Sequence, residues 1–358
     1  MSKQGVTAEP VELEINDIAF GGAGVGRIDG KACFVKFTIP GEKISARVVR
    51  DHSKYSEGEL VNVLTPSEDR ITPLCEYAGA CGGCSYQHID YARQLEIKSR
   101  QVEEALKRVG GFANVPMQPI IASPKPYAYR NRITVHRDGR VTGFYDFRGR
   151  QLVDIASCAI ASPAVNDMLR RLRLSHVRDG NFTLSEPLAT GGFLQTNAAV
   201  AALLLKCVEK HCPEKAELLV DAFCGAGFFL KHLLPHFSRG VGIEWSNASI
   251  RAASRKKADN ETYHEGSVSE HLENVLSSGD RDSTVLILDP PSQGLDKKIP
   301  QIINHALPSK VIYVSCKPAT LARDLKLLSS HYVLEAVTPI DMFPQTAEIE
   351  VVASLLRK

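Results

Sequence analysis

The chain has 358 residues, with 43 Lys and Arg against 41 Asp and Glu, and a formal net charge of +2. Hydrophobic residues make up 44% of the sequence and charged residues 23%, which is typical of a folded protein and excludes extensive disorder. The charge balance excludes a uniformly basic nucleic-acid-binding protein. The sequence has neither a long apolar stretch nor a signal-peptide pattern at its start, so we expect a cytoplasmic protein without a membrane span, and nothing indicates an oligomer.

Residues 1–66 form the first predicted domain. Short alternating segments such as VELEI, KACFVKF and KISARVV are separated by turns rich in Gly and Pro, a pattern that predicts a small closed β-barrel of the OB type. Barrels of this type bind oligonucleotides, although a purely structural barrel remains an alternative because a fold alone does not assign a function.

Residues 67–188 form the second predicted domain. An amphipathic helix is expected to end at Gly110 and Gly111, followed by the strands NRITVHR and VTGFYDF with a turn at Asp138 and Gly139. Basic residues, among them Arg130 and Arg132, alternate with aromatic residues between positions 125 and 150. Cations bind phosphates and flat rings stack on bases, so this segment is predicted to face single-stranded RNA. A solvated sheet face is the alternative.

Residues 189–358 form the third predicted domain. The apolar runs LLVDAF, GVGIE, TVLILDPP and KVIYVSC alternate with helical segments, which predicts an α/β fold with a doubly wound, Rossmann-like parallel sheet. Two strands at the end of the sequence are expected to form a hairpin at the sheet edge. Ligands of such sheets bind at the carboxyl ends of the strands, so the residues that end each run are candidates for a site.

Three of these strand ends carry chemically informative residues. The turn Asp221–Gly227 contains Gly225 and Gly227, which allow a ligand to approach the backbone, and Glu244 ends the next strand, where a carboxylate suits ribose hydroxyls. The fourth strand ends in Asp289-Pro290-Pro291, which resembles the substrate-side motif of S-adenosylmethionine-dependent methyltransferases that act on bases. Simple tight turns after strands are the alternative interpretation.

The next strand ends in a cysteine, Cys316, followed by Lys317. A cysteine at a strand end beside a cationic residue is a candidate nucleophile. Further along, Glu348 and Glu350 supply carboxylates at alternate positions of one segment, so they share a face of a strand.

Several of these segments together resemble the RNA uracil-5-methyltransferase family, which makes 5-methyluridine in ribosomal and transfer RNA. The similarity covers nearly the whole chain and is carried, in family order, by GGFLQTN, DAFCGAG, DPPSQGL, YVSCKPATLARDL and DMFPQTAEIE. The sequence departs from the family pattern at Phe228, Ser292, Lys317 and Glu348. None of these departures removes a presumed catalytic group.

The resemblance implies S-adenosyl-L-methionine as the cofactor, Cys316 as the nucleophile that adds to C6 of uracil, and Glu350 as the base that removes the C5 proton. Phe193 is implied as a stacking partner of the target base, which must leave its RNA structure to be reached. Asp289 is implied either as a cofactor contact or as a residue that holds the uracil edge. The other implied cofactor residues are Gln195, Phe223, Gly225, Gly227, Phe228, Glu244 and Ser267.

Four cysteines form a further candidate site. Cys75, Cys81 and Cys84 lie within ten positions, and the resemblance adds Cys158 as the fourth ligand of a [4Fe-4S] cluster. A four-cysteine zinc site is the alternative, although the usual second cysteine pair is absent.

The resemblance finally favours one branch of the family. An N-terminal barrel of the TRAM type combined with the cysteine group is similar to the branch that acts on 23S ribosomal RNA. A transfer-RNA methyltransferase is the first alternative, and a non-catalytic RNA-binding or assembly protein of the same fold is the second. The presence of both Cys316 and Glu350 argues against the second alternative.

Overall fold

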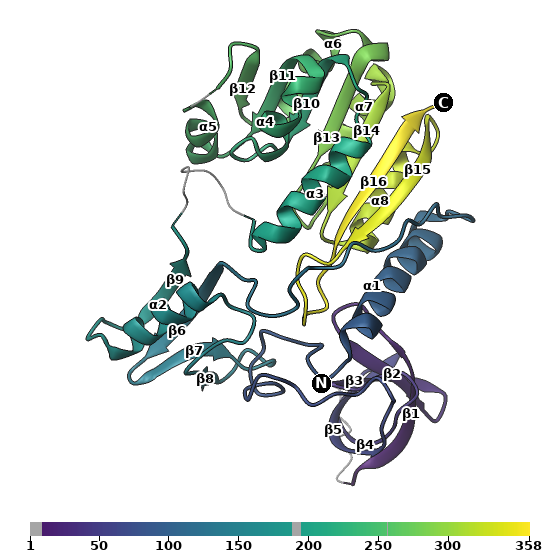
Figure 1. Ribbon diagram of the computed structural model, residues 1–358. Helices are drawn as coiled ribbons and strands as arrows, with labels where there is room; N and C mark the ends of the chain where they lie inside the picture. The colour runs from purple at the N-terminus through teal and green to yellow at the C-terminus, as the bar shows by residue number, and fades with distance from the viewer. Residues whose placement is uncertain (1–8, 188–194, 256) are drawn as a thin grey trace. The chain divides into compact units, whose positions relative to one another are not determined.

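The structure is a computed structural model that describes residues 9–187, 195–255 and 257–358 (Figure 1). These residues form two compact units. The first unit contains the described residues up to Gln101, together with Lys125–Glu186 and Phe343–Glu348. The second contains Val102–Pro124, the described residues of Pro187–Met342, and Ile349–Lys358. In the described part of the chain, no helix is long and apolar enough to cross a membrane.

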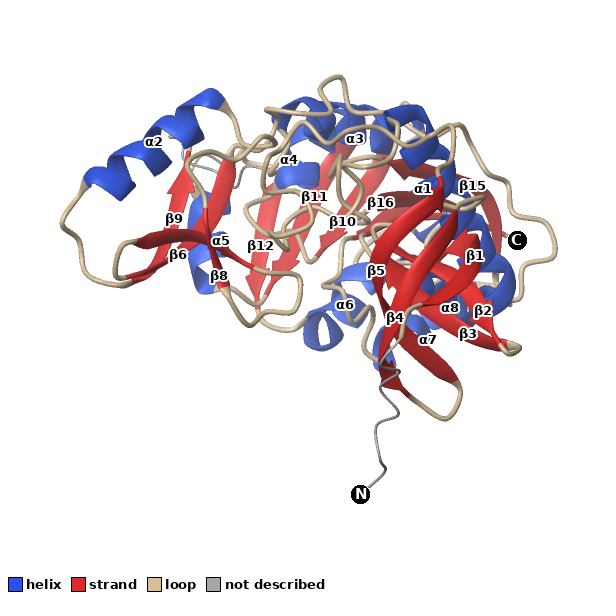
Figure 2. Ribbon diagram, turned by 90° about the horizontal axis from the view of Figure 1, so that it is seen from below, coloured by secondary structure: helices blue, strands red, loops and turns tan. Residues whose placement is uncertain are grey.

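The first unit begins with a closed five-stranded barrel, which confirms the predicted barrel (Figure 2). Its strands are β1 (Val11–Ile18), β2 (Ala23–Ile28), β3 (Lys31–Lys36), β4 (Lys43–Asp51) and β5 (Tyr55–Thr65). The parallel pairing of β3 with β5 closes it in the order β1-β2-β3-β5-β4. Alternate side chains point inward along each strand, and the interior contains Leu13, Ile15, Cys33, Val35, Ile44 and Ala46.

The same unit contains a four-stranded antiparallel sheet in the order β8-β7-β6-β9. The strands are β6 (Arg132–Asp138), β7 (Val141–Tyr145), β8 (Leu152–Asp154) and β9 (Gly180–Ser185). The predicted turn joins β6 to β7, and Gly139 has a φ of 58° there. Helix α2 (Pro163–Leu174) packs its Val165 and Leu169 against Ile133 and Val135 of β6.

Helix α1 (Tyr91–Ala105) continues into a π-helical turn, Leu106–Gly110, and ends where Gly111 adopts a left-handed φ of 75°. The predicted helix end is therefore confirmed. The boundary between the two units falls within this helix, between Gln101 and Val102.

The second unit is built on a seven-stranded sheet in the order β12-β11-β10-β13-β14-β16-β15. The parallel strands are β10 (Ala216–Ala222), β11 (Phe237–Glu244), β12 (Glu261–Glu265), β13 (Thr284–Leu288) and β14 (Lys310–Ser315). The strands β15 (Tyr332–Ile340) and β16 (Glu350–Arg357) form the predicted C-terminal hairpin, with β16 antiparallel to β14. The doubly wound sheet predicted from the sequence is confirmed.

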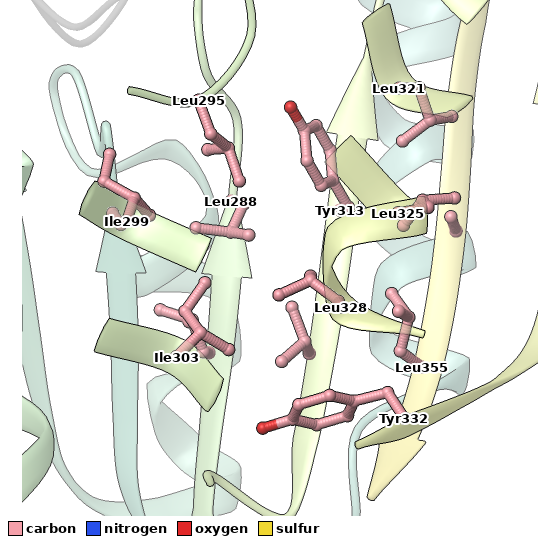
Figure 3. Close-up of a cluster of buried hydrophobic side chains, with 14 of the residues drawn as sticks. Leu288, Leu295, Ile299, Ile303, Tyr313, Leu321, Leu325, Leu328, Tyr332 and Leu355 are labelled. Atoms are coloured by element: carbon pink, nitrogen blue, oxygen red, sulfur yellow. The ribbon is translucent and has the colours of Figure 1, made fainter. Parts of the chain in front are cut away.

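Helices connect the strands of this sheet. They are α3 (Ala198–Lys210), α4 (Phe228–Leu233), α5 (Asn247–Ser254), α6 (Val268–Ser277), α7 (Lys298–Ala306) and α8 (Pro318–Leu328), with short 3₁₀ turns at Leu234–His236 and Arg281–Ser283. Figure 3 shows apolar side chains of α7 and α8, including Ile299, Ile303, Leu321 and Leu325, packed beside those of the central strands. The helices cover the faces of the parallel strands. This packing fixes the positions of the strand ends.

Candidate active site

The residues that follow the parallel strands lie along one edge of the seven-stranded sheet. The five parallel strands share their carboxyl edge, and the antiparallel β16 starts at that same edge. In the order of the strands, the predicted site residues at this edge are Ser267, Glu244, Phe223, Asp289, Cys316 and Glu350. The topology thus collects residues from six separate sequence segments.

Cys316 and Glu350 are neighbours in the register of β14 and β16. These strands pair Val314 with Val352 and Ser315 with Val351, and one further step along the register sets Cys316 opposite Glu350. Directly opposed residues of antiparallel strands have Cα atoms about 4.5–5.5 Å apart. Both side chains are half-buried. The register therefore favours this pair as a combined nucleophile and base.

Glu348, the alternative carboxylate, has a different environment. It is exposed, and it belongs to the first compact unit, whereas Glu350 is the first residue of β16 in the second unit. The strand register does not include Glu348. Its position therefore does not match that of a carboxylate paired with Cys316.

Cys316 also lies immediately before the N-terminus of an eleven-residue helix. Lys317 is the N-cap of α8 and Pro318 is its first residue, a position where the missing N–H of proline costs no hydrogen bond. The backbone N–H of Lys317 donates to Oγ of Ser315 at 3.2 Å. The partial positive charge of a helix N-terminus stabilises an anionic sulfur.

The turn after β10 has an unusual backbone. Phe223, Gly225 and Gly227 all have positive φ angles, of 68°, 55° and 82°. The N–H groups of Phe223 and Cys224 both donate to the carbonyl of Ile243, at 2.9 and 3.1 Å, which holds the non-glycine Phe223 in this conformation. A Cβ on Gly225 would meet no atom within 4 Å, so open space lies above the backbone where a ligand could bind.

Two carboxylates are buried next to this turn. Glu244 accepts hydrogen bonds from the N–H groups of Gly225 (3.1 Å) and Ser246 (2.8 Å). Asp221 is fully buried and accepts from the N–H of Leu230 at 2.9 Å, while its Oδ1 has no hydrogen-bond partner. Burial, reinforced by the charges of Asp289 and Glu244, raises the pKa of Asp221 to about 8. Burial also raises the pKa of Asp289 to about 7. A cationic ligand at this edge would favour the ionised form of these groups.

The remaining predicted cofactor residues occupy helix starts. Phe228 is the first residue of α4 and packs edge-on against Phe229. Ser267 is the N-cap of α6, and its N–H donates to Glu270 at 3.1 Å. Gln195 is half-buried, two positions before the N-cap of α3. Phe193 lies outside the described residues.

The four predicted metal ligands all belong to the first unit and interact electrostatically. Burial, reinforced by the other three cysteines, raises the pKa of the Cys84 thiol to about 12. Burial also raises the pKa of Cys81, with Cys158 and Cys75 contributing, and the pKa of Cys158, with Cys75 contributing. The structure therefore brings the four residues into one neighbourhood. Across residues 9–187, 195–255 and 257–358, however, no three or more His, Cys, Asp or Glu side chains are arranged to hold a metal ion.

The basic segment of residues 125–150 divides into structural and exposed members. Arg137 donates to the carbonyls of Leu172 and Ser175, at 2.7 and 3.1 Å, and so holds the end of α2. Arg130 is half-buried and donates to the carbonyl of Arg132 at 3.1 Å. Arg132 is exposed at the start of β6, which leaves it accessible to a phosphate.

The segment between β15 and β16 contains polar residues that the sequence analysis did not identify. Gln345 has a positive φ of 69° and is almost completely buried, as is Gln94 of α1. Lys98, one turn after Gln94, is fully buried too. The spacing of Gln94 and Lys98, four positions apart on an amphipathic helix, is the only sequence signal that could have revealed them.

Known RNA methyltransferases are similar to the chain in sequence. The model of the tRNA (uracil-5-)-methyltransferase family matches residues 271–358, and that of the TRAM domain matches residues 8–61. RNA methyltransferases of Thermosynechococcus vestitus and Gloeobacter violaceus are each 30% identical to the chain, with 99% and 98% of the chain and 98% and 97% of those proteins covered.

A solved structure matches nearly the whole chain as well. The tRNA (uracil-54, C5)-methyltransferase of Pyrococcus abyssi, in complex with S-adenosyl-L-homocysteine, has a TM-score of 0.74 and 22% sequence identity, and the match covers 97% of this chain and all of that one. This similarity shows the fold: a methyltransferase domain preceded by an N-terminal barrel. The chain contains both a TRAM domain and a tRNA (uracil-5-)-methyltransferase domain. It therefore belongs to the family of RNA methyltransferases.

Proposed function

We propose that the protein uses S-adenosyl-L-methionine to methylate C5 of a specific uridine in RNA, with 23S ribosomal RNA as the substrate. The observation that carries this proposal is the register of β14 and β16, which sets Cys316 opposite Glu350 at the sheet edge that also holds the glycine turn and Asp289. A thiol and a carboxylate side by side match the nucleophile and base that C5 methylation of uracil requires.

The residues at the edge of β10 and β11 fit the methyl donor. The open space above Gly225 allows a close approach to the backbone, and the Glu244 carboxylate, fixed by two N–H donors, suits a ribose diol. When bound, S-adenosyl-L-methionine supplies an electrophilic methyl group. We assign its binding to Gln195, Phe223, Gly225, Gly227, Phe228, Glu244, Ser267 and Asp289.

Cys316 and Glu350 then act in sequence on the pyrimidine. The Cys316 thiolate, stabilised by the N-terminus of α8, adds to C6 and so makes C5 an enolate-like nucleophile. After C5 has gained the methyl group, the Glu350 carboxylate takes the C5 proton. The electron pair of that C–H bond re-forms the C5–C6 double bond, and the Cys316–C6 bond breaks to release the thiolate.

Recognition of the RNA is assigned to four residues. Asp289 directly follows β13, the strand next to β14. Burial raises its pKa to about 7, and its protonated carboxyl can donate a hydrogen bond to a uracil carbonyl. Phe193 is proposed to stack on the flipped base. Arg132, exposed on β6, and its neighbour Arg130 are proposed to bind phosphates.

We further propose a structural [4Fe-4S] cluster held by Cys75, Cys81, Cys84 and Cys158. The donor set fits in kind, because four cysteine thiolates are the ligands that such a cluster takes, and all four cysteines belong to the first unit. A Cβ on Gly82 would lie 2.8 Å from the carbonyl of Asp146, so the loop wraps closely against β7. Protein purified without oxygen should be brown and contain about four irons per chain; colourless, zinc-containing protein would refute the cluster.

Transfer RNA is the second candidate substrate. It is favoured by the structural similarity to the transfer-RNA methyltransferase of Pyrococcus abyssi. Ribosomal RNA is preferred because the chain combines a TRAM barrel with the group of four cysteines. Methylation of deproteinised 23S rRNA and of bulk tRNA, followed by mass-spectrometric detection of 5-methyluridine, distinguishes the two.

The mechanism is tested by two substitutions with matched controls. Cys316→Ala should abolish methylation, whereas Cys212→Ala, another half-buried cysteine, should not. Glu350→Gln should trap the protein covalently on RNA in a complex that survives denaturation, because elimination needs the base. Glu348→Gln should turn over normally. Turnover by Cys316→Ala, or trapping by Glu348→Gln instead of Glu350→Gln, would refute the assignment.

A further inference from the structure

The segment that connects β15 to β16 is held firmly within the first unit. Residues Phe343–Glu348 belong to that unit, although both flanking strands belong to the second. Gln345, at the centre of the segment, is 1% exposed and has a positive φ of 69°. A non-glycine residue keeps this conformation only where its surroundings impose it. The contacts around Gln345 therefore hold its backbone in this conformation.

Gln345 is paired with Gln94 of helix α1. Nε2 of Gln94 donates to Oε1 of Gln345 at 3.0 Å, and the backbone N–H of Gln345 donates to Oε1 of Gln94 at 3.1 Å. The same Nε2 also donates to the carbonyl of Ile89 at 2.9 Å. Gln94 is completely buried, so each of these bonds forms where no water can replace it.

The cysteine-containing loop contributes further bonds to the same segment. The carbonyl of Gln345 accepts from the N–H groups of Ser85 and Tyr86, at 3.1 and 3.0 Å. Oγ of Ser85 accepts from the N–H of Ala347 at 2.9 Å. Ser85 directly follows Cys84, one of the four proposed cluster ligands. The segment is thus bonded to the residue next to the proposed cluster.

Two more side chains fix the start of the segment. Nζ of the buried Lys98 donates to the carbonyl of Phe343 at 3.1 Å. The hydroxyl of Tyr129 donates to the carbonyl of Pro344 at 3.0 Å. Successive backbone groups of residues 343–347 are therefore held by α1, by the loop after Cys84 and by Tyr129.

We infer that Gln94 and Gln345 are positioning residues for the Glu350 carboxylate and act on it through the two residues that follow Ala347. The inference deepens the proposed function and rests on it. Only Glu348 and Ile349 separate the last bonded residue, Ala347, from Glu350. Three residues of extended chain span at most about 10 Å, so a shift of the bonded segment is passed directly to the start of β16.

The other side of Glu350 is fixed by the sheet, where Glu350 pairs with Ile340 of β15. The carboxylate therefore lies between two anchored stretches of chain. Loss of one anchor should leave β16 paired but allow the carboxylate to move. A misplacement of about 1 Å costs up to about 100-fold in rate.

The test uses Gln94→Met, which keeps the size of the side chain and removes its hydrogen bonds. Arg93→Met is the control, because Arg93 lies on the same helix and pairs with Asp69 and Glu96, outside the bonded segment. For Gln94→Met we expect kcat to fall at least about 10-fold, with the KM for RNA and for the methyl donor unchanged. We also expect denaturation-resistant RNA–protein adduct to accumulate during turnover.

The adduct distinguishes positioning from a merely structural role. A variant with a loosened fold would form less adduct, whereas a displaced base slows only elimination and lets the adduct accumulate. Gln345→Gly is the second variant, because glycine tolerates the positive φ while the side-chain acceptor is lost. It should show the same adduct in a folded protein.

Glu350→Gln, measured in parallel, separates the two proposals. If it traps adduct while neither Gln94→Met nor Gln345→Gly does, the positioning inference is wrong and the proposed function stands. Unchanged kcat in both Gln94→Met and Gln345→Gly would likewise refute the positioning inference and leave the proposed function standing. If Glu350→Gln traps no adduct, the proposed mechanism fails, and the inference fails with it.

Discussion

The buried carboxyl of Asp221 should make the stability of the second unit depend on pH. Burial and the nearby Asp289 and Glu244 raise its pKa from 3.8 to about 8. In the unfolded chain the carboxyl ionises near its ordinary value, so above pH 4 the folded state binds a proton that the unfolded state has lost. The protonated Asp221 carboxyl therefore makes its full contribution to the free energy of unfolding below about pH 4, and this contribution is lost as the pH rises toward 8.

Asp221→Asn replaces the ionisable carboxyl with an amide that does not titrate and has nearly the same shape. The amide oxygen can still accept from the N–H of Leu230, which donates to the native carboxyl at 2.9 Å. Each pH unit within the window corresponds to about 1.4 kcal/mol. Between about pH 5 and about pH 7.5, the free energy of unfolding of the native protein should fall relative to the variant by about 3 kcal/mol.

Urea unfolding at several pH values measures this difference. The single tryptophan, Trp245, belongs to the second unit and reports on it by fluorescence, and hydrogen exchange of β10 provides an independent measure. Asp259→Asn, an exposed carboxyl in the same unit, is the control and should show no pH-dependent difference. If the free energies of unfolding of the native protein and of Asp221→Asn change with pH in the same way, the pKa of Asp221 is not raised in the folded protein.

Three further changes test the first unit. Glu42→Gln should lower its free energy of unfolding by about 3 kcal/mol in thermal unfolding, because it leaves Arg70 without its buried counter-charge. Although burial opposes ionisation, hydrogen bonds from Arg70 lower the pKa of Glu42, so the native pair loses its contribution as the pH falls below 4.5. Gly143→Ala should cost about 2 kcal/mol and speed hydrogen exchange in β8, because its Cβ would lie 2.0 Å from the carbonyl of Val153. Arg132→Gln should weaken RNA binding and reduce the slope of log affinity against log salt by about 1.

The predictions for Glu42 and Arg132 each have a control on the surface of the same unit. Glu12→Gln removes an exposed ion pair with Lys43 at 3.0 Å and should change stability by less than about 0.5 kcal/mol. If Glu42→Gln behaves like Glu12→Gln, the buried pair is not stabilising. Arg171→Gln, on the exposed side of α2, should leave RNA binding and its salt slope unchanged. An equal effect of Arg171→Gln and Arg132→Gln would indicate non-specific attraction.

The parts of the fold that depend on local patterns could be predicted from the sequence. The parallel sheet follows from apolar runs such as TVLILDPP, because a strand buried on both faces has no polar alternation. The end of α1 follows from Gly111, which adopts the left-handed conformation that ends the helix. The placement of Glu244 and Cys316 at strand ends follows from the same local patterns.

Long-range pairing could not be predicted in the same way. The neighbourhood of Cys316 and Glu350 depends on β16 lying between β14 and β15, which no local pattern specifies. The apolar Tyr91 and Leu95 of α1 are only half-buried, whereas the polar Gln94 of the same helix is fully buried. The polar partner that makes this burial favourable, Gln345, lies 251 positions away in the chain. Hydrogen bonds over such separations leave no periodic signal.

The place of β16 between two strands that precede it in the chain has a consequence for biosynthesis. When β14 and β15 have emerged from the ribosome, β14 has its partner β13 on one side, but both strands still lack β16, with which they pair instead of with each other. Both present unpaired backbone groups to other nascent chains until β16 is made. The same late strand carries Glu350, so under the proposed mechanism the nucleophile Cys316 and its base come together only after the last strand has been made.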